Sequence, residues 1–339
     1  MKKIAIVNRH EIYNKNNNLF NANIYPIGEN LEAPWVNIKE IFMQNKIELM
    51  TIDQLSLDEF DAIIFLDYPN KKYEYLLKLL EKMGKKKYLI VLESPVVCRE
   101  NLSADILKKF DKIFTWSDNF FGNNVYNLKL TNKIPKKILQ NNKKKLCTMI
   151  SGNKKVKYSG ELYSERLRAL EWFEKTCPED FDLYGVGWDY KILKFPFDRF
   201  KFIKLFFPTN YKTYKGKIEK KIDILSQYKF SICYENVKGY DGYITEKIFD
   251  CFFAGTIPIY LGADNISNYI PEETFIRKDK FPTYEDLYNY LKNMTSIEYN
   301  NYITAIKKFV ENEKCREFNS EKIGIQIYNQ IKNDFEQSK

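Results

Sequence analysis

The sequence predicts an α/β protein built from two Rossmann-like halves, and three observations support that fold class. Short apolar runs that are typical of buried strands alternate with amphipathic helical runs through residues 1–115. Residues 131–145 are rich in lysine and asparagine, contain Pro135, and interrupt this alternation. A second alternation begins at residue 146, and a chain of 339 residues is long enough for two ordinary hydrophobic cores.

The first half should form a parallel sheet, because helices separate its strands. Strands are predicted at residues 4–7, 47–51, 62–66, 88–92 and 113–115, and helices at residues 36–44 and 75–83. We therefore predict an N-terminal domain over residues 1–140. The lysine- and asparagine-rich residues 131–145 are the candidate linker to the second domain.

The second half repeats this pattern and ends in helices. Strands at residues 146–150 and 181–184 are expected on either side of a helix at residues 163–174, and three helices follow at residues 284–294, 297–311 and 321–331. We predict a second domain over residues 146–315 and a terminal helix within residues 316–339.

Residues 228–262 are the most informative part of the chain, because they combine a buried strand, a glycine-bearing loop and a charged helix. Phe230, Ile232 and Tyr234 alternate with other residues as in a strand, and Gly239 and Gly242 then break the run. A helix is predicted from about residue 243 to residue 254. A junction of this kind offers backbone N–H groups and the positive end of a helix dipole, which suits a phosphate group.

The predicted helix carries Tyr243, Glu246 and Lys247 at spacings of three and four, so these residues should share one side. Lys247 would supply a point charge for a diphosphate, and Glu246 can accept two hydroxyl protons from a ribose or a sugar. Taken alone, Glu246 and Lys247 are better explained as a solvated pair of charges on a helix surface, because a motif match is only a hypothesis until its context is confirmed.

The context of these residues resembles the α-1,3-fucosyltransferase family. The matching elements are Tyr228-Lys229-Phe230, Tyr234-Glu235-Asn236, Tyr243-Ile244-Thr245-Glu246-Lys247 and Ile257-Pro258-Ile259-Tyr260-Leu261-Gly262. Two further patches, Glu93-Ser94-Pro95 and Ser151-Gly152-Asn153 with Arg166 on the following helix, resemble the same family. The resemblance spans roughly residues 92–276 and is weaker in its first half.

This resemblance implies a GT-B type α/β fold, with two Rossmann-like domains facing a cleft and C-terminal helices packing back across them. The first domain would bind the acceptor and the second the donor, GDP-L-fucose. The resemblance also implies that Glu93 is the base that deprotonates the acceptor hydroxyl and that Arg166 binds the donor diphosphate. We assign Asn236, Tyr243, Glu246 and Lys247 to the donor site as well.

Sugar transfer to an alcohol requires a proton acceptor and positive charge near the departing diphosphate. The single histidine, His10, is expected in an exposed or loosely packed loop, so a carboxylate base is favoured. Glu93 ends a predicted strand, where parallel sheets open their ligand crevice, and Glu29 and Glu32 are the next candidates. Arg166 and Lys247 supply the charge, so no obligatory metal or other cofactor is expected.

Asp180 and Asp182 form an acidic pair that could be taken for a metal site, but we predict no metal there. Residues 181–184 alternate as a strand that enters a turn, so a hydrated sheet edge explains both carboxylates. Residues 192–214 have no clean period, and two interpretations stay open: a mobile loop beside the donor, or an insertion packed by its aromatic side chains.

Composition and net charge limit the classes of partner and the cellular location that we expect for this protein. The net charge of +9 favours anionic nucleotides and peripheral contact with an acidic inner membrane face, where a lipid-linked acceptor would be found. Nucleic-acid binding is not expected, because the lysines are scattered and no recognised motif is present. The six cysteines include no C-x-x-C pair, and the apolar run before Asn8 is only four residues long. We therefore predict a cytoplasmic protein with no signal peptide.

We therefore predict an inverting transfer of L-fucose from GDP-L-fucose to a glycan hydroxyl. The expected position is O3 of N-acetylglucosamine or glucose in a lipopolysaccharide or Lewis-type acceptor. The alternatives are a GT-B transferase of another nucleotide sugar and a non-catalytic protein that binds a nucleotide sugar. The sequence contains both the candidate base Glu93 and the candidate diphosphate-binding residues Arg166 and Lys247. This favours an enzyme, because binding a nucleotide sugar requires no base. The sequence leaves the acceptor and the oligomeric state open.

Overall fold

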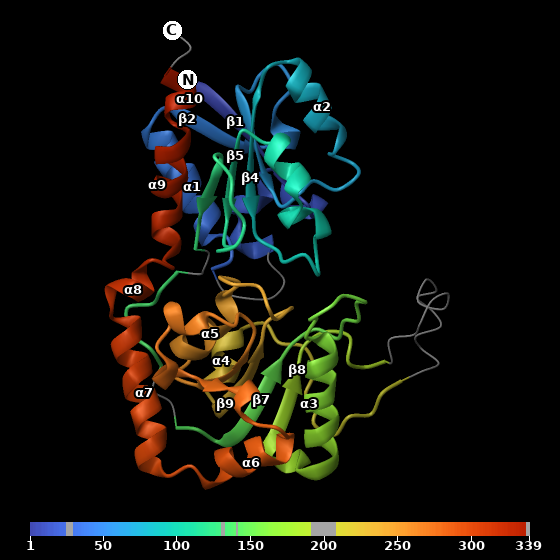
Figure 1. The fold of residues 1–339 in the computed structure, drawn as a ribbon, viewed down its shortest axis with the longest axis vertical. Coiled ribbons are helices and arrows are strands. Elements are labelled where there is room, and N and C mark those ends of the chain that lie inside the picture. Colours follow the sequence, from blue (N-terminus) through green and yellow to red (C-terminus); the bar gives the residue numbers. More distant parts are fainter. Residues whose placement is uncertain (25–29, 130–132, 140–141, 191–207, 337–339) are drawn as a thin grey trace. The chain divides into compact units, whose positions relative to one another are not determined.

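The computed structural model describes residues 1–24, 30–129, 133–139, 142–190 and 208–336. The chain divides into two compact units (Figure 1). The first consists of Met1–Ile134, Asp241–Tyr243 and Glu313–Lys339, and the second of Pro135–Tyr240 and Ile244–Asn312. The first boundary therefore lies six residues before the end of the predicted N-terminal domain, and three residues near position 242 belong to the first unit.

The first unit contains a parallel six-stranded sheet with the strand order β2-β1-β3-β4-β5-β6. Its strands are β1 (Lys2–Asn8), β2 (Ile47–Thr51), β3 (Ala62–Leu66), β4 (Lys86–Val91), β5 (Lys112–Thr115) and β6 (Val125–Asn127), with helices α1 (Ala33–Gln44) and α2 (Tyr75–Lys82) between them. All five residues of β3 are buried, as expected for a central strand of a sheet covered on both faces. The predicted alternating organisation is confirmed, and β6 is an additional strand.

The C-terminal helices α8 (Glu313–Arg316), α9 (Ser320–Ile331) and α10 (Asn333–Glu336) belong to the first unit. Ile323, Ile327 and Ile331 of α9 lie in one buried cluster with Ile38 and Phe42 of α1. Helix α9 therefore completes the core that the first strand begins. The packing of a C-terminal helix across both domains stays a prediction.

The second unit contains a parallel five-stranded sheet with the order β11-β10-β9-β7-β8. The strands are β7 (Lys145–Ile150), β8 (Phe181–Tyr184), β9 (Tyr228–Tyr234), β10 (Ile257–Leu261) and β11 (Ile276–Arg277). The helices are α3 (Tyr163–Thr176), α4 (Lys221–Leu225), α5 (Glu246–Phe253), α6 (Tyr284–Asn293) and α7 (Ser296–Val310). The fold class, two parallel sheets with helices, is therefore the predicted one.

The start of α5 differs from the prediction. The helix begins at Glu246 rather than near residue 243, because the preceding Thr245 has an extended backbone with φ −107° and ψ −178°. Lys247 thus lies in the first turn of α5. Residues 191–207 lie outside the described residues, and they include most of the segment 192–214 for which two interpretations are given above. Glu29 also lies outside the described residues. None of the described helices is both long enough and apolar enough to span a bilayer.

Candidate functional site: a charged network at the end of the second sheet

The strand order of the second sheet changes direction at β7. β8 follows β7 in the chain and pairs with one edge of it, whereas β9 pairs with the other edge. Helix α3 follows β7 and helix α5 follows β9, so both helices start from the carboxyl ends of the strands at this switch point. Open parallel sheets bind their ligands at this position.

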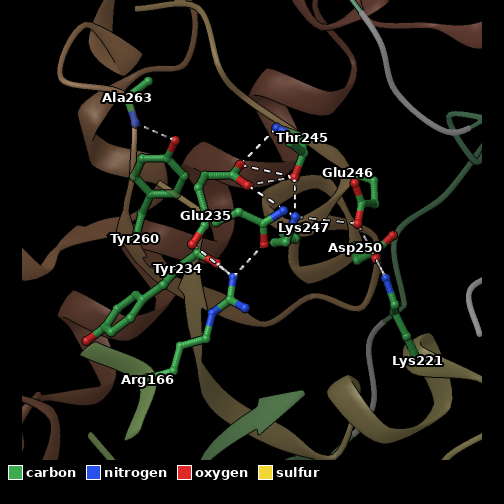
Figure 2. Close-up of polar contacts among 11 residues, drawn as sticks. Arg166, Lys221, Tyr234, Glu235, Thr245, Glu246, Lys247, Asp250, Tyr260 and Ala263 are labelled. Carbon is green, nitrogen blue, oxygen red and sulfur yellow. Dashed lines mark hydrogen bonds and ion pairs between the residues drawn. The ribbon is translucent and has the colours of Figure 1, made fainter. Parts of the chain in front are cut away.

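Glu235 follows β9 and has no exposed surface. Its carboxylate accepts hydrogen bonds from the backbone N–H of Thr245 at 2.9 Å and from the Thr245 hydroxyl at 2.8 Å (Figure 2). It also pairs with the ammonium of Lys247 at 3.2 Å. A buried carboxylate requires such partners, and here they tie the end of β9 to the first turn of α5.

Gly262, the last residue of the family-like run, leaves room for this carboxylate. A Cβ atom at Gly262 would lie 2.6 Å from Cγ of Glu235 and 2.4 Å from the hydroxyl oxygen of Tyr260, which is closer than real Cβ atoms approach. The Tyr260 hydroxyl accepts a hydrogen bond from the backbone N–H of Ala263 at 3.1 Å (Figure 2). The glycine is therefore required by packing against Glu235.

Lys247 and Glu246 form the exposed part of the network. Their side chains are 27% and 29% exposed, and the Lys247 ammonium lies 3.7 Å from the Glu246 carboxylate. Lys221 of α4 lies 3.7 Å from Glu246 and 3.0 Å from the carboxylate of Asp250 (Figure 2). Burial opposes ionisation of Glu246, but the charges of Lys247 and Lys221 lower its pKa to about 2. Glu246 is thus a hydrogen-bond acceptor at neutral pH.

Arg166 lies on α3 and is 6% exposed. Its Nη2 atom donates to the carbonyl oxygens of Tyr234 at 2.6 Å and Glu235 at 2.8 Å, and to Oδ1 of Asn236 at 3.2 Å. The guanidinium therefore holds the end of β9 in place, besides placing a positive charge there. The structure brings Arg166, Asn236, Glu246 and Lys247 into one neighbourhood, as the sequence analysis expected.

Tyr243 does not share a helix face with Glu246 and Lys247, because α5 begins after it. Its ring is buried and lies 4.6 Å from the ring of Trp116, with which it belongs to the first unit. The predicted arrangement of these three residues on one arc is therefore wrong. The donor-site role of Tyr243 stays a prediction.

Glu93 follows β4 in the first unit, in the predicted position after the strand. It is partly exposed, and its backbone N–H donates to Oδ1 of Asp67 at 2.8 Å. Its backbone carbonyl accepts a hydrogen bond from the side-chain amide of Asn101 at 2.7 Å. His10 is exposed, as predicted for a loop histidine. The role of Glu93 as a base stays a prediction.

The carboxylates of Asp180 and Asp182 have separate structural partners. Asp180 accepts hydrogen bonds from Tyr288 at 2.6 Å and Lys292 at 2.7 Å. Asp182 is 2% exposed and pairs with Lys145 and Lys215. A hydrated sheet edge is therefore the wrong explanation for Asp182, whose charge is neutralised internally. Among the described residues, no cluster of three or more His, Cys, Asp or Glu side chains has the arrangement of a metal site.

The Ser151-Gly152-Asn153 patch follows β7 and borders a cavity in the second unit. The side-chain amide of Asn153 donates to the carbonyl oxygen of Gly187 at 2.9 Å. Asn153 also lines a cavity of ≈ 340 Å³, together with Lys154, Tyr163 and Tyr190 among others. The patch therefore shapes the loops at the carboxyl ends of β7 and β8.

Solved glycosyltransferases share this fold over nearly the whole chain. A crystal structure of an α1,3-fucosyltransferase matches with a TM-score of 0.56 and 16% identity, covering 98% of this chain and 90% of that chain. A crystal structure of an α1,3-fucosyltransferase with GDP-fucose gives a TM-score of 0.51 at 16% identity and covers 92% and 91% of the two chains. The fold is thus of the GT-B glycosyltransferase type.

A family model matches part of the second half of the chain. Residues 203–332 match the family model for glycosyltransferase family 10 (fucosyltransferase) C-term. An alpha-(1,3)-fucosyltransferase of Helicobacter pylori is 40% identical over 75 residues, which are 22% of this chain but only 16% of that protein. The resemblance to the α-1,3-fucosyltransferase family is therefore confirmed, and within residues 203–332 the chain is similar to the C-terminal part of glycosyltransferase family 10 (fucosyltransferase) proteins.

The sequence pattern did not predict the roles of Glu235 and Lys221. Glu235 is part of the family-like run, but nothing in that run marks it as the buried partner of Lys247. Lys221 lies in a lysine-rich stretch, where nothing in the local pattern separates it from solvated lysines. Only the approach of α4 to α5 gives Lys221 its acidic neighbours.

Proposed function

We propose that the protein is an inverting fucosyltransferase that moves L-fucose from GDP-L-fucose to a hydroxyl group of a glycan. The observation that carries the proposal is the network around Glu235, which lies in the segment matched by the family and fixes Lys247 at the first turn of α5. The solved fucosyltransferase with GDP-fucose supports the choice of donor. The proposed acceptor position is O3 of N-acetylglucosamine or glucose.

The donor would be held by groups of the second unit. Lys247 and Arg166 would stabilise the negative charge of the diphosphate, and the N–H groups at the start of α5 would add to this field. The carboxylate of Glu246 would accept hydrogen bonds from ribose or fucose hydroxyls, since its low pKa keeps it ionised. Asn236 and Tyr243 are proposed to complete this site.

The transfer would be a single displacement. Glu93 accepts the proton of the acceptor hydroxyl, the oxygen attacks C1 of fucose, and the bond between C1 and the diphosphate oxygen breaks. Fucose is thereby transferred with inversion, GDP leaves with the electron pair of the broken bond, and Glu93 carries the proton. We propose that this requires no metal ion, so full retention of activity in EDTA is the expected result.

The test is GDP release and product mass for the wild-type protein with a panel of donors and glycan acceptors. GDP-fucose should be the preferred donor. Lys247→Ala should lower turnover at least about tenfold, because one charge-assisted contact is worth roughly 1.5 to 3 kcal/mol. Lys143→Ala is the matched control, since Lys143 donates to the backbone carbonyl of Ala254, the residue that follows α5, at 3.1 Å. It should leave GDP affinity unchanged.

Glu93→Gln should separate a base from a structural glutamate. The amide keeps the shape of the side chain but cannot accept the proton, so the transfer rate should fall about 10²-fold. Calorimetric affinity for GDP-fucose should be unchanged. A fully active variant would refute Glu93 as the base and direct attention to Glu32.

Two alternative functions would give different results in these assays. A transferase of another nucleotide sugar would release its nucleotide from a different donor in the panel. A binding protein without catalysis would take up GDP-fucose and release no GDP with any acceptor. The cytoplasmic location, the membrane-face contact and a lipid-linked acceptor are also proposals, which sedimentation with anionic vesicles and the acceptor panel would test.

A further inference from the structure

Asp67 lies at the carboxyl end of β3, next to the segment that carries Glu93. It is 5% exposed and adopts a left-handed backbone with φ 63°, which aspartate tolerates better than most residues. Oδ1 of Asp67 accepts hydrogen bonds from the backbone N–H groups of Leu92 at 2.8 Å and Glu93 at 2.8 Å. The carboxylate therefore caps the two residues that follow β4.

Asn101 adds the second half of this arrangement. It is fully buried, and its side-chain N–H₂ donates to Oδ1 of Asp67 at 2.7 Å and to the backbone carbonyl of Glu93 at 2.7 Å. Its own Oδ1 accepts the backbone N–H of Tyr68 at 2.8 Å. Asn101 thus connects the residues after β3 to the residues after β4.

Together these contacts hold Glu93 from both sides of its Cα atom. Asp67 binds the N–H group that precedes the Cα atom, and Asn101 binds the carbonyl group that follows it. Fixing both peptide groups restricts φ and ψ at Glu93, and this determines the direction in which the side chain leaves the backbone. A general base needs such control, because an error of about 1 Å in placement can cost about 10²-fold in rate.

We propose that Asp67 and Asn101 are positioning residues that orient Glu93 for proton abstraction. This inference rests on the proposed function, because it concerns the same base. Neither residue is proposed to contact the substrates. Both act on the rate of transfer through the backbone of Glu93.

We call the hydrogen bonds of Asp67 and Asn101 to the backbone of Glu93 the clamp. Two variants at Asp67 distinguish the loss of these hydrogen bonds from an effect of backbone strain at residue 67. Asp67→Gly removes the acceptor while glycine tolerates the positive φ, and Asp67→Asn keeps an oxygen acceptor at a φ that asparagine also tolerates. The transfer rate should fall about 10- to 100-fold in Asp67→Gly and clearly less in Asp67→Asn. Asn101→Ala should resemble Asp67→Gly. The affinity for GDP-fucose should be unchanged in all three variants.

Matched controls exist in the same unit. Asp111 accepts the backbone N–H of Lys87 at 2.8 Å at the opposite end of β4, so Asp111→Ala removes a similar carboxylate contact far along the strand from Glu93. Asn124 donates to the carbonyl oxygens of Leu107 and Phe110, so Asn124→Ala is the control for Asn101→Ala. Both controls should keep the wild-type transfer rate.

Two measurements decide the proposal. Amide hydrogen exchange at residues 92 and 93 should accelerate in Asp67→Gly and Asn101→Ala but not in the controls. In a Glu93→Gln background, Asp67→Gly should cause no further loss of rate, because it acts through Glu93. Unchanged exchange, or an equal loss of rate in that background, would overturn the positioning role.

Failure of the proposed function gives a different pattern. If Glu93→Gln is fully active, Glu93 is not the base and the positioning role is overturned with it. If the wild-type protein releases no GDP with any donor and acceptor, the proposed function has failed. The hydrogen exchange of the amides of residues 92 and 93 then still tests whether Asp67 and Asn101 hold the backbone at Glu93. Faster exchange in the variants supports this structural role, and unchanged exchange overturns it.

Discussion

Glu235 shows how one buried side chain organises the site at the residue scale. Its carboxylate accepts hydrogen bonds from the N–H group and the hydroxyl of Thr245 and forms an ion pair with Lys247, whereas the partly buried Glu246 lies near two lysines. The two glutamates therefore have different tasks. Glu235 ties the start of α5 to the end of β9 and pairs with Lys247, whereas Glu246 keeps part of its surface exposed, as its proposed role in donor binding requires.

We expect Glu235→Gln to weaken GDP binding and to lower stability together. The amide can still accept the Thr245 N–H but no longer pairs with the Lys247 charge, so the loss should be about 1 to 3 kcal/mol in the free energy of unfolding. Chemical denaturation and GDP calorimetry are the measurements. Glu174→Gln is the matched control, because Glu174 accepts the N–H and hydroxyl of Thr213 in the same way but pairs with no site lysine.

The control variant should lose stability without losing GDP affinity. If both variants lost GDP affinity equally, a general loosening of the second unit would explain the result. If Glu235→Gln bound GDP normally, Lys247 would not depend on Glu235 for its position.

At the element scale, the first turn of α5 concentrates opposite charges from several elements. Lys221 comes from α4, Glu246, Lys247 and Asp250 come from α5, and Glu235 comes from the end of β9. Periodicity alone correctly predicted a helix here, because Ile248 and Phe252 lie one turn apart and are both buried. It placed the start three residues early, since Thr245 uses its hydroxyl and N–H for Glu235 instead of continuing the helix.

This cluster predicts how stability depends on pH. Burial opposes ionisation of Glu246, yet Lys247 and Lys221 lower its pKa from 4.5 to about 2 in the folded protein. The unfolded state therefore binds more protons between these values, so the stabilisation by Glu246 is present above pH 4.5 and is lost as the pH falls toward 2. Glu246→Gln should weaken this acid dependence.

The measurement is the free energy of unfolding in urea at a series of pH values from neutral to acidic. Glu285→Gln removes an exposed glutamate from the first turn of α6 and serves as the control. It should keep the wild-type dependence on pH. An identical acid dependence in Glu246→Gln and the wild type would contradict the effect of the two lysines.

At the scale of the whole molecule, the sequence predicted both parallel sheets and most of their strands, because buried parallel strands appear as short apolar runs between helices. It could not predict which side chains meet between distant segments. The contacts among Asp67, Glu93 and Asn101 join segments that are separated along the chain, and no local sequence pattern predicts them. The same holds for α9, whose apolar face predicts a buried helix without naming α1 as its partner.

The chain leaves the first unit near residue 134, contributes Asp241–Tyr243 to it, and returns to it at residue 313. Ile327 of α9 and Ile306 of α7 are both fully buried, but they belong to the first and second units respectively. We expect Ile327→Ala and Ile306→Ala each to cost about 2 to 5 kcal/mol, because each leaves a cavity in a packed core. Their effects should appear in different parts of the molecule.

Hydrogen exchange resolved along the sequence measures this difference. Ile327→Ala should raise exchange in β1 and β2 at the start of the chain, although it lies more than 270 residues away from them, and should leave GDP affinity unchanged. Ile306→Ala is its matched control and should raise exchange in β9 and β10 instead. If Ile327→Ala loosened β9 and β10 while β1 and β2 stayed protected, α9 would stabilise the second unit, and the assignment of both chain ends to one core would be wrong.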